Sequence, residues 1–311
     1  MASRHHPRPR ARRRFDDELS PYQPDRTSLA DETSDLHRPP LLDDDHDHDV
    51  GDDDGDDGEP PLSTYPDATH GPHPVPAWVV TDADARDVDR GVLKTGKEAE
   101  VSLVERSTPE QSCLLAAKRY RTREHRLFHR DAGYLEGRRV RRSRETRAMA
   151  TRTDFGRDLI AGQWASAEFA ILGRLWSVGA AVPYPVQLIG TELLLEFIGD
   201  PDGTAAPRLA QLRPDRTEAH DLFEQLREVL LVVADVGYTH GDLSAYNVLV
   251  HDGRLVLIDV PQVVDIVGNP QGFDYLRRDC RNICQWFATH GVPDADGDEL
   301  ADWLSSSIPR G

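Results

Sequence analysis

The sequence is poor in cysteine and has no long apolar run. Its 311 residues include only three cysteines, too few for the disulfide framework that stabilises small secreted domains. Residues 1–14 are basic rather than apolar, and nowhere do about 18 apolar residues follow one another, as a membrane-spanning helix requires. These absences argue against a secreted or membrane-spanning protein and predict a cytoplasmic one with no membrane contact.

Residues 1–76 lack the apolar periodicity of a folded domain. They are rich in proline, and the stretch from residue 41 to 60 carries ten aspartates and one glutamate without any basic residue. Such a segment buries too little apolar surface to offset the entropy of ordering it, so we predict a disordered acidic tail over residues 1–76. Two roles stay open: the tail keeps the protein in solution, or it competes with nucleic acid for a basic partner.

From residue 77 onward, apolar residues return in short runs bounded by glycine and proline. The patterns predict a strand–turn–strand unit over residues 91–104 and further strands at 114–118 and 193–198. Helices are predicted over 164–176, 222–237 and 273–288, and Asp252-Gly253 predicts the turn of a hairpin between strands 247–250 and 255–260. On the last helix, Cys280 and Cys284 are expected to be small buried residues. A β-rich start followed by helices predicts an α+β fold.

The strongest chemical signal is the segment from His240 to Asn247, which has the spacing His-x-Asp-Leu-x-x-x-Asn. In phosphoryl transfer a carboxylate orients the acceptor hydroxyl and takes its proton, and a nearby amide oxygen binds magnesium. Asp242 and Asn247 supply these two groups. Asp259 ends the next apolar strand, where a second magnesium ligand is needed. The sequence therefore predicts a phosphotransferase that uses ATP and Mg²⁺, and the alternative is that both aspartates only cap turns.

The segment Lys94-Thr95-Gly96-Lys97-Glu98-Ala99-Glu100-Val101 lies in the predicted strand–turn–strand unit, where a loop can cover phosphates. It has a single glycine, so Thr95 and Lys97 are expected to share the phosphate contacts with the backbone. Lys118, at the end of the following strand, is expected to pair with the phosphates, and Glu168 on the next helix to hold Lys118. The alternative for Glu168 is an exposed position without such a partner.

Lysine is scarce, and its positions support these assignments. Of the 37 basic residues only Lys94, Lys97 and Lys118 are lysine, and all three lie in the expected nucleotide site. In a chain that otherwise uses arginine, a lysine indicates a position where a compact ammonium fits and a planar guanidinium does not.

Several segments resemble the type 1 branch of the RIO family of atypical serine/threonine protein kinases, over residues 78–288. Residues 93–99 are similar to that branch's Ser-Thr-Gly-Lys-Glu-Ala loop, with Lys94 in place of the serine. Residues 195–199 resemble its Met-Glu-Phe-Ile-Gly hinge, and residues 206–209, 258–262 and 273–280 resemble later segments of the family. The resemblance implies that the hinge at Leu195, Glu196 and Ile198 holds adenine.

The resemblance also implies a bilobal protein-kinase-like fold without the activation loop and peptide-binding helices of ordinary protein kinases. We expect an N-lobe and hinge over residues 77–198 and a C-lobe over residues 199–311. The acceptor is a serine of a protein or of the chain itself, or water if the protein acts as an ATPase switch, in which case Asp259 itself accepts phosphate. The expected catalytic residues are Asp242, Asp259 and Lys118, and Asn247 and Asp259 are expected to bind the metal. The expected nucleotide contacts are Thr95, Gly96, Lys97, Glu98, Val101, Lys118, Glu168, Leu195, Glu196, Ile198, Asn247 and Asp259.

Residues 121–157 form a strongly basic stretch, which the family resemblance implies is a flexible insertion. Arginine-rich segments can follow a phosphate backbone, so RNA or a ribosomal particle is a candidate partner, and docking onto the acidic tail is the alternative. Two other functions also stay open. A small-molecule phosphotransferase of the aminoglycoside or choline kinase type shares the His-Gly-Asp-Leu segment, and an RNA- or ribosome-associated scaffold would bind ATP with little turnover.

Overall fold

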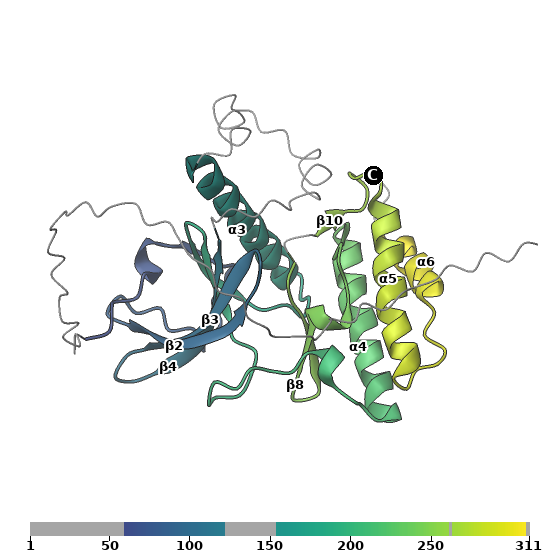
Figure 1. Ribbon diagram of the computed structural model, residues 1–311, viewed down its shortest axis with the longest axis horizontal. Coiled ribbons are helices and arrows are strands. Elements are labelled where there is room, and N and C mark those ends of the chain that lie inside the picture. Colours follow the sequence, from purple (N-terminus) through teal and green to yellow (C-terminus); the bar gives the residue numbers. More distant parts are fainter. Residues whose placement is uncertain (1–58, 122–153, 261–262, 309–311) are drawn as a thin grey trace, which may run out of the picture. The chain divides into compact units, whose positions relative to one another are not determined.

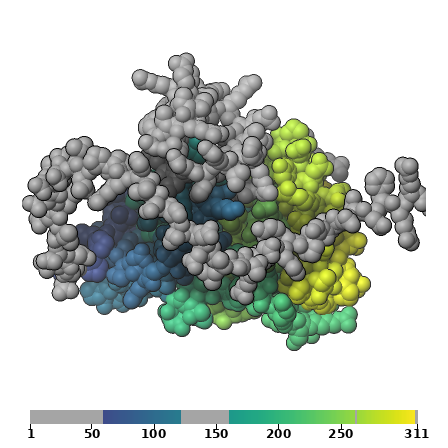
Figure 2. Space-filling view, in the orientation of Figure 1, coloured from purple at the N-terminus to yellow at the C-terminus, as the bar shows by residue number. Residues whose placement is uncertain are grey.

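The computed structural model describes residues 59–121, 154–260 and 263–308, which belong to one structural unit, Asp57–Gly311. The predicted tail up to residue 58 and most of the basic stretch at 121–157 lie outside the described residues. In the space-filling view, the strands of the N-lobe and the helices near the C-terminus lie at opposite ends of this unit (Figure 2). A strand-rich lobe followed by a helical lobe confirms the α+β, bilobal fold that the sequence predicts (Figure 1).

A six-stranded antiparallel sheet forms the N-lobe, with the strand order β1-β5-β6-β4-β3-β2. Its strands are β1 (Thr69–His70), β2 (Arg86–Thr95), β3 (Ala99–Ser107), β4 (Ser112–Tyr120), β5 (Pro185–Ile189) and β6 (Glu192–Glu196). Helix α3 (Asp154–Ser177) packs against β4, β5 and β6 (Figure 1). The strands and the helix predicted for this half of the domain are all present.

The central strands of this sheet are buried on both faces. Along β6, Leu193 and Leu195 belong to the large core shared with α3, whereas Leu194 belongs to a second cluster with Leu115 of β4. A strand with two covered faces has no polar side to show, so it appears in the sequence as a continuous apolar run. Both runs, 114–117 and 193–195, have this character.

The second cluster is covered by residues from the segment before β2, so the fold begins earlier than the boundary we predicted at residue 77. β1 pairs with β5, the Ser63 amide donates to the Ala85 carbonyl at 2.7 Å, and Tyr65 is only 8% exposed. The physical reason is aromatic burial: the ring of Tyr65 stacks on His70 with their centroids 4.1 Å apart. One buried aromatic residue anchors a segment whose overall composition is that of a tail.

The C-lobe, in the described ranges, consists of three α-helices and two short strand pairs. The elements are α4 (Arg216–Asp235), α5 (Gly272–Thr289), α6 (Gly297–Ser307), the hairpin β8 (Val248–His251) and β9 (Arg254–Leu257), and the pair β7 (Tyr238–Thr239) and β10 (Val264–Asp265). Asp252 and Gly253 have φ of +50° and +71°, as a two-residue hairpin turn requires, which confirms the predicted hairpin. None of the helices in the described ranges combines the length and apolar character that crossing a bilayer needs.

Helix α5 confirms the expectation for the two neighbouring cysteines. Cys280 and Cys284 are each 1% exposed and lie in the main core, and burial raises the pKa of both thiols. They therefore pack as small apolar residues. Cys113 is also buried, in the second cluster of the N-lobe, and all three cysteines are free thiols.

Candidate active site

Lys118 lies between two carboxylates where the two lobes meet. Its Nζ donates to Glu168 Oε1 of α3 at 2.6 Å and to Oδ1 of Asp259, shortly after β9, at 3.0 Å. The side chains of Lys118 and Glu168 are 11% and 2% exposed, whereas that of Asp259 is 43% exposed. Burial by itself would lower the pKa of Lys118, but the two carboxylates outweigh burial and raise it. Lys118 therefore stays charged throughout the physiological pH range.

Tyr120 contacts the second carboxylate oxygen of Glu168 and was not among the predicted site residues. The Tyr120 hydroxyl donates to Glu168 Oε2 at 2.5 Å, so both carboxylate oxygens of Glu168 have partners. Burial, followed by the nearby Glu168 charge, raises the pKa of Tyr120, so its hydroxyl keeps the proton that it donates. Residues two apart on a strand share a face, and this spacing from Lys118 is the signal that could have revealed Tyr120.

Asp259 has a left-handed backbone conformation, with φ of +64°, that residues with a side chain adopt infrequently. The preceding residue is held on both sides. The Ile258 amide donates to the Asn247 carbonyl at 2.9 Å, and His240 Nε2 donates to the Ile258 carbonyl at 3.0 Å. Burial alone would raise the pKa of Asp259. The charge and the hydrogen bond of Lys118, together with the charge of Lys94, outweigh burial, so the pKa lies below its ordinary value. The carboxylate is therefore ionised and fixed beside Lys118.

Asp242 and Asn247 lie in the loop that follows β7 and ends in the short helix η3 (Ala245–Asn247). The Asp242 side chain is exposed, while the next residue, Leu243, is fully buried and anchors the loop in the core. Asn247 Nδ2 donates to the Asp242 carbonyl at 2.8 Å, which leaves Oδ1 as the amide atom that can bind a metal. Through the Asn247 carbonyl, this loop is also joined to the segment that carries Asp259.

Asp279 of α5 holds this loop in place through hydrogen bonds to its backbone, and it was not among the predicted site residues. It is 1% exposed and accepts hydrogen bonds from Thr239 Oγ1 at 2.9 Å, the Gly241 amide at 2.6 Å and the Leu243 amide at 3.1 Å. Burial raises its pKa against the opposing effect of His240 and these three donors. A charged residue in line with the apolar face of a predicted helix is the signal that could have found it.

The predicted phosphate loop forms the turn between β2 and β3. Gly96 closes the turn, because its amide donates to the Ala99 carbonyl at 2.9 Å and a Cβ there would lie 2.9 Å from the same oxygen. Thr95, Lys97 and Glu98 are exposed. As far as the structure describes the chain, none of these three side chains forms a hydrogen bond or ion pair with the groups around Lys118.

The predicted hinge lies where β6 passes into the C-lobe. The Glu196 amide donates to the Tyr184 carbonyl at 2.8 Å, and the Ile198 carbonyl accepts from the Ala206 amide at 2.9 Å. Leu195 is 9% exposed and belongs to the main core. Within the described residues no acceptor takes the Ile198 amide hydrogen, which leaves this donor for a ligand.

The structure thus brings together part of the predicted site. Lys118, Glu168 and Asp259 are in direct contact, and Asn247 is joined to the same segment. Val101 lies opposite Lys118 in the register of β3 and β4, and paired residues of neighbouring strands point to one face of the sheet. Asp242 lies on the loop that carries Asn247, whereas Thr95 and Lys97 lie at the tip of the β2–β3 turn.

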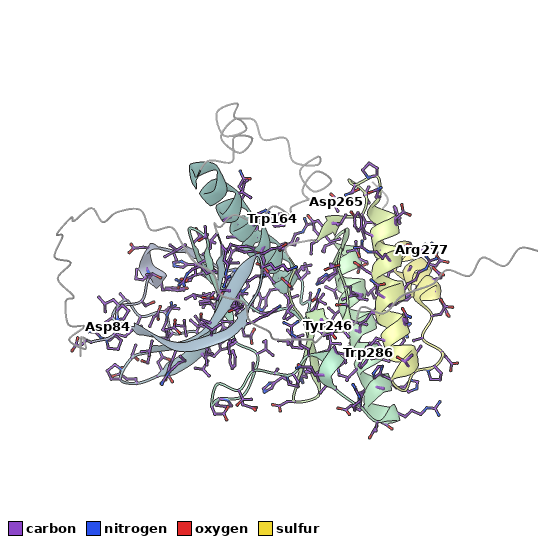
Figure 3. All side chains as sticks on the ribbon, viewed as in Figure 1. Asp84, Trp164, Tyr246, Asp265, Arg277 and Trp286 are labelled. Atoms are coloured by element: carbon purple, nitrogen blue, oxygen red, sulfur yellow. The ribbon has the colours of Figure 1, made fainter. Side chains whose placement is uncertain are left out.

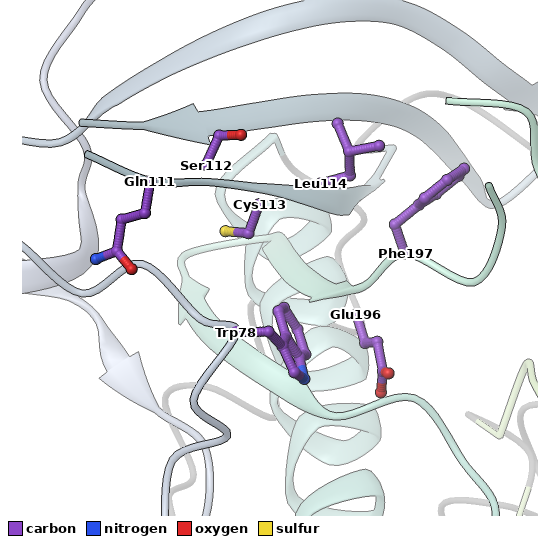
Figure 4. Close-up of a pocket in the computed structure, with 7 residues that line it drawn as sticks. All are labelled: Trp78, Gln111, Ser112, Cys113, Leu114, Glu196 and Phe197. Carbon is purple, nitrogen blue, oxygen red and sulfur yellow. The ribbon is translucent and has the colours of Figure 1, made fainter. Parts of the chain in front are cut away.

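An open hollow of about 350 Å³ beside the hinge is separate from this site (Figure 4). Its lining residues are Trp78, Gln111, Ser112, Cys113, Leu114, Glu196 and Phe197. Cys113 belongs to the cluster on the sheet face opposite α3, while Lys118 points toward α3. The hollow therefore adjoins the hinge on the sheet face opposite Lys118. Neither Lys118 nor the loop with Asp242 lines it.

The donor set of Asn247 and Asp259 suits magnesium. Magnesium prefers oxygen ligands and is often held by one or two carboxylates together with phosphate oxygens and water. Asp259 offers an ionised carboxylate, and Asn247 offers a free amide oxygen. The described residues contain no group of three histidine, cysteine or acidic side chains placed to hold a metal.

The N-lobe is rich in strands and holds a buried lysine–glutamate pair, Lys118 and Glu168. The C-lobe carries a His-x-Asp loop, and the aspartate that follows it, Asp259, contacts Lys118. These features define the chain as a protein-kinase-like protein. The model of the RIO domain family matches residues 108–300, more than half of the chain. The RIO-type serine/threonine-protein kinase Rio1 of Haloferax volcanii is 35% identical over 220 residues, which are 70% of this chain and 69% of that protein. The chain therefore belongs to the RIO family of serine/threonine protein kinases.

Other relatives are matched over a smaller share of their length. The serine/threonine-protein kinase RIO1 of Caenorhabditis elegans is 37% identical over 131 residues, which are 42% of this chain and 26% of that protein. Among solved structures, the Rio2 kinase from Chaetomium thermophilum matches with a TM-score of 0.50 at 20% identity, covering 71% of this chain and 64% of that chain. This likeness supports the fold. The residues that the RIO domain model matches begin at 108 and therefore do not include the turn that contains Gly96.

Proposed function

We propose that this protein is an ATP- and Mg²⁺-dependent serine/threonine kinase whose site is built on Lys118, Asp242, Asn247 and Asp259. The observation that carries the proposal is the contact of Lys118 with both Glu168 and Asp259, because it joins the N-lobe to the metal-binding segment of the C-lobe. A triphosphate bound beside Lys118 would therefore lie next to Asn247 and Asp259. Adenine would bind at the hinge, where the Ile198 amide supplies a donor and the Glu196 backbone lies beside it.

The chain's own groups divide the chemistry between them. Lys118 binds and orients phosphate oxygens, and Glu168 keeps the ammonium in place. Asp242, exposed on a loop with a buried anchor, holds the acceptor hydroxyl and takes its proton. Asn247 and Asp259 would hold magnesium, which, when bound, would neutralise charge on the phosphates.

The acceptor is a serine hydroxyl of a protein or of this chain. We propose a second route, in which Asp259 itself accepts the phosphate. In that route a carboxylate oxygen of Asp259 attacks the terminal phosphorus, the bond to the bridging oxygen breaks and ADP leaves. Water then hydrolyses the acyl phosphate, so that the protein acts as an ATPase switch. The ionised state of Asp259 supports its use as a nucleophile. The three free thiols suit a reducing compartment, and we place the activity in the cytoplasm.

ATP turnover in three variants tests this proposal. Asp242→Asn and Asp259→Asn should each lower the turnover at least about a hundredfold, because each removes a carboxylate from the reacting groups. Asp252→Asn changes an exposed aspartate in the β8–β9 turn and is the matched control, which should retain wild-type turnover. Turnover that persists in both active-site variants would rule out the proposed mechanism.

The same assay identifies the acceptor. Purified protein is incubated with labelled ATP, alone, with a serine-rich peptide mixture and with a panel of small alcohols, and the label is followed into each fraction. Label in protein or peptide serine supports the kinase, and acid-labile label on Asp259 supports the switch. Label confined to a small alcohol would instead establish a small-molecule phosphotransferase.

A further inference from the structure

Lys94 stands on the same face of the N-lobe sheet as Lys118. In the strand register Lys94 pairs with Val101, and Val101 in turn pairs with Lys118. Directly paired residues of antiparallel strands point to one face, so the two lysines flank Val101 on the side that meets the C-lobe. Lys94 is thereby placed over the site from a different strand than Lys118.

Arg208 is fixed on the C-lobe side of the same site. Its Nη1 donates to the Tyr246 carbonyl at 2.7 Å, its backbone amide donates to Gln211 Oε1 at 2.8 Å, and its backbone forms an isolated bridge with Leu249. Tyr246 directly precedes the metal-ligand candidate Asn247, and Figure 3 shows it, in that view, between the N-lobe strands and helix α4. The guanidinium is therefore held beside the loop that would contact the phosphates, and among the described residues its other nitrogens form no hydrogen bond with an acceptor.

The charges of these residues influence one another directly. Burial lowers the pKa of Lys94, Arg208 and Lys118 lower it further, and Asp259 opposes them. The pKa of Lys94 is thus influenced by cations of both lobes, and Asp259 already forms its ion pair with Lys118. In the described ranges neither Lys94 nor Arg208 forms an ion pair of its own. Two uncompensated cations facing one site repel each other and would be stabilised by a bound anion.

We infer that Lys94 and Arg208 form a second cationic site, one residue from each lobe, that binds the terminal phosphate of the nucleotide. Lys118 binds the inner phosphates, and this second pair makes the protein select nucleoside triphosphates over diphosphates. The inference rests on the proposed function, since it assigns a further part of the same nucleotide site. It gives a role to the lysine that replaces the serine of the similar family loop.

Calorimetric titration with ADP and with a non-hydrolysable ATP analogue, in the presence of Mg²⁺, tests the inference. Lys94→Ser and Arg208→Gln should each weaken the binding of the ATP analogue by about tenfold, while the binding of ADP changes less than about twofold. Lys94→Arg keeps a cation and should retain most of the preference for the triphosphate. Arg254→Gln removes an exposed arginine of the β8–β9 hairpin and is the control for a general loss of positive charge.

The outcomes separate this inference from the proposed function. In the double variant, the two losses should not add, because both residues contact one phosphate group. Equal loss of affinity for ADP and the ATP analogue, or no loss for either, would refute the second cationic site while leaving nucleotide binding at Lys118 intact. Failure of the wild-type protein to bind either nucleotide would refute both. Melting temperatures measured alongside confirm that each variant is folded.

Discussion

Lys118 illustrates how single residues build the site. Its ammonium is almost fully buried between Glu168 and Asp259, and Glu168 is in turn held by Tyr120. The rarity of lysine and the strand position indicated Lys118 from the sequence alone, and the spacing His-x-Asp-Leu-x-x-x-Asn indicated Asp242 and Asn247. The spacing of two residues places Tyr120 on the same strand face as Lys118, but the local sequence does not show that its hydroxyl contacts Glu168 of another element.

Glu196 offers a test of electrostatics at the hinge. Burial raises the pKa of this carboxyl above its ordinary value of 4.5, although the Tyr184 amide donates to it at 3.0 Å and partly opposes the shift. The folded state therefore holds the proton more tightly than the unfolded state. As pH rises from 4.5 through the raised pKa, the contribution of Glu196 to the free energy of unfolding decreases, and it stays decreased above that range.

Glu196→Gln should remove this pH-dependent loss, since the glutamine oxygen can still accept from the Tyr184 amide. We expect the melting temperature of the variant to exceed that of the wild type at pH 7, with a smaller or reversed difference at pH 4. Differential scanning fluorimetry across this range measures the effect, and Glu110→Gln in the exposed β3–β4 turn is the control. A variant that is less stable at pH 7 than at pH 4, relative to the wild type, would contradict the assigned cause.

At the scale of elements, the loop that carries Asp242 and Asn247 depends on helix α5 through Asp279. Asp279→Ala would leave three donors, from Thr239, Gly241 and Leu243, without their buried acceptor. We expect the free energy of unfolding to fall by about 2–5 kcal/mol and turnover to fall with it. Chemical denaturation gives the first quantity. Asp274→Ala, an exposed first-turn position of the same helix, should cost less than about 1 kcal/mol. Equal costs for the two variants would show that Asp279 does not position the loop.

Elements with their own local signal were predictable, and those that depend on distant partners were not. The β8–β9 hairpin followed from Asp252-Gly253, because these residues tolerate the positive φ that its turn requires. Strand β5 begins at a proline and is recognised only by its pairing with β6 and β1. The two-residue strands β7 and β10 likewise exist only through each other, and α6 was not predicted at all.

For the whole molecule, the main difference from expectation is the start of the fold. Composition marked residues up to 76 as a tail, yet Tyr65 belongs to the second N-lobe cluster and Val75 packs against it. Arg106, fully buried, pairs with Asp87 at 2.7 Å and lies 5.6 Å from the Tyr65 ring, which extends the contacts of this segment into the sheet. Composition averages over a window, so it conceals one or two residues that are well buried.

The central claim is that the two lobes together bind a magnesium nucleotide between Lys118 and the pair Asn247 and Asp259. The most direct test is a crystal structure with Mg²⁺ and a non-hydrolysable ATP analogue. We predict a metal about 2.1 Å from oxygens of both Asn247 and Asp259, with phosphate oxygens at hydrogen-bonding distance from Lys118 Nζ. Nucleotide bound elsewhere, such as in the hollow behind the hinge, or a metal that contacts neither residue, would contradict it.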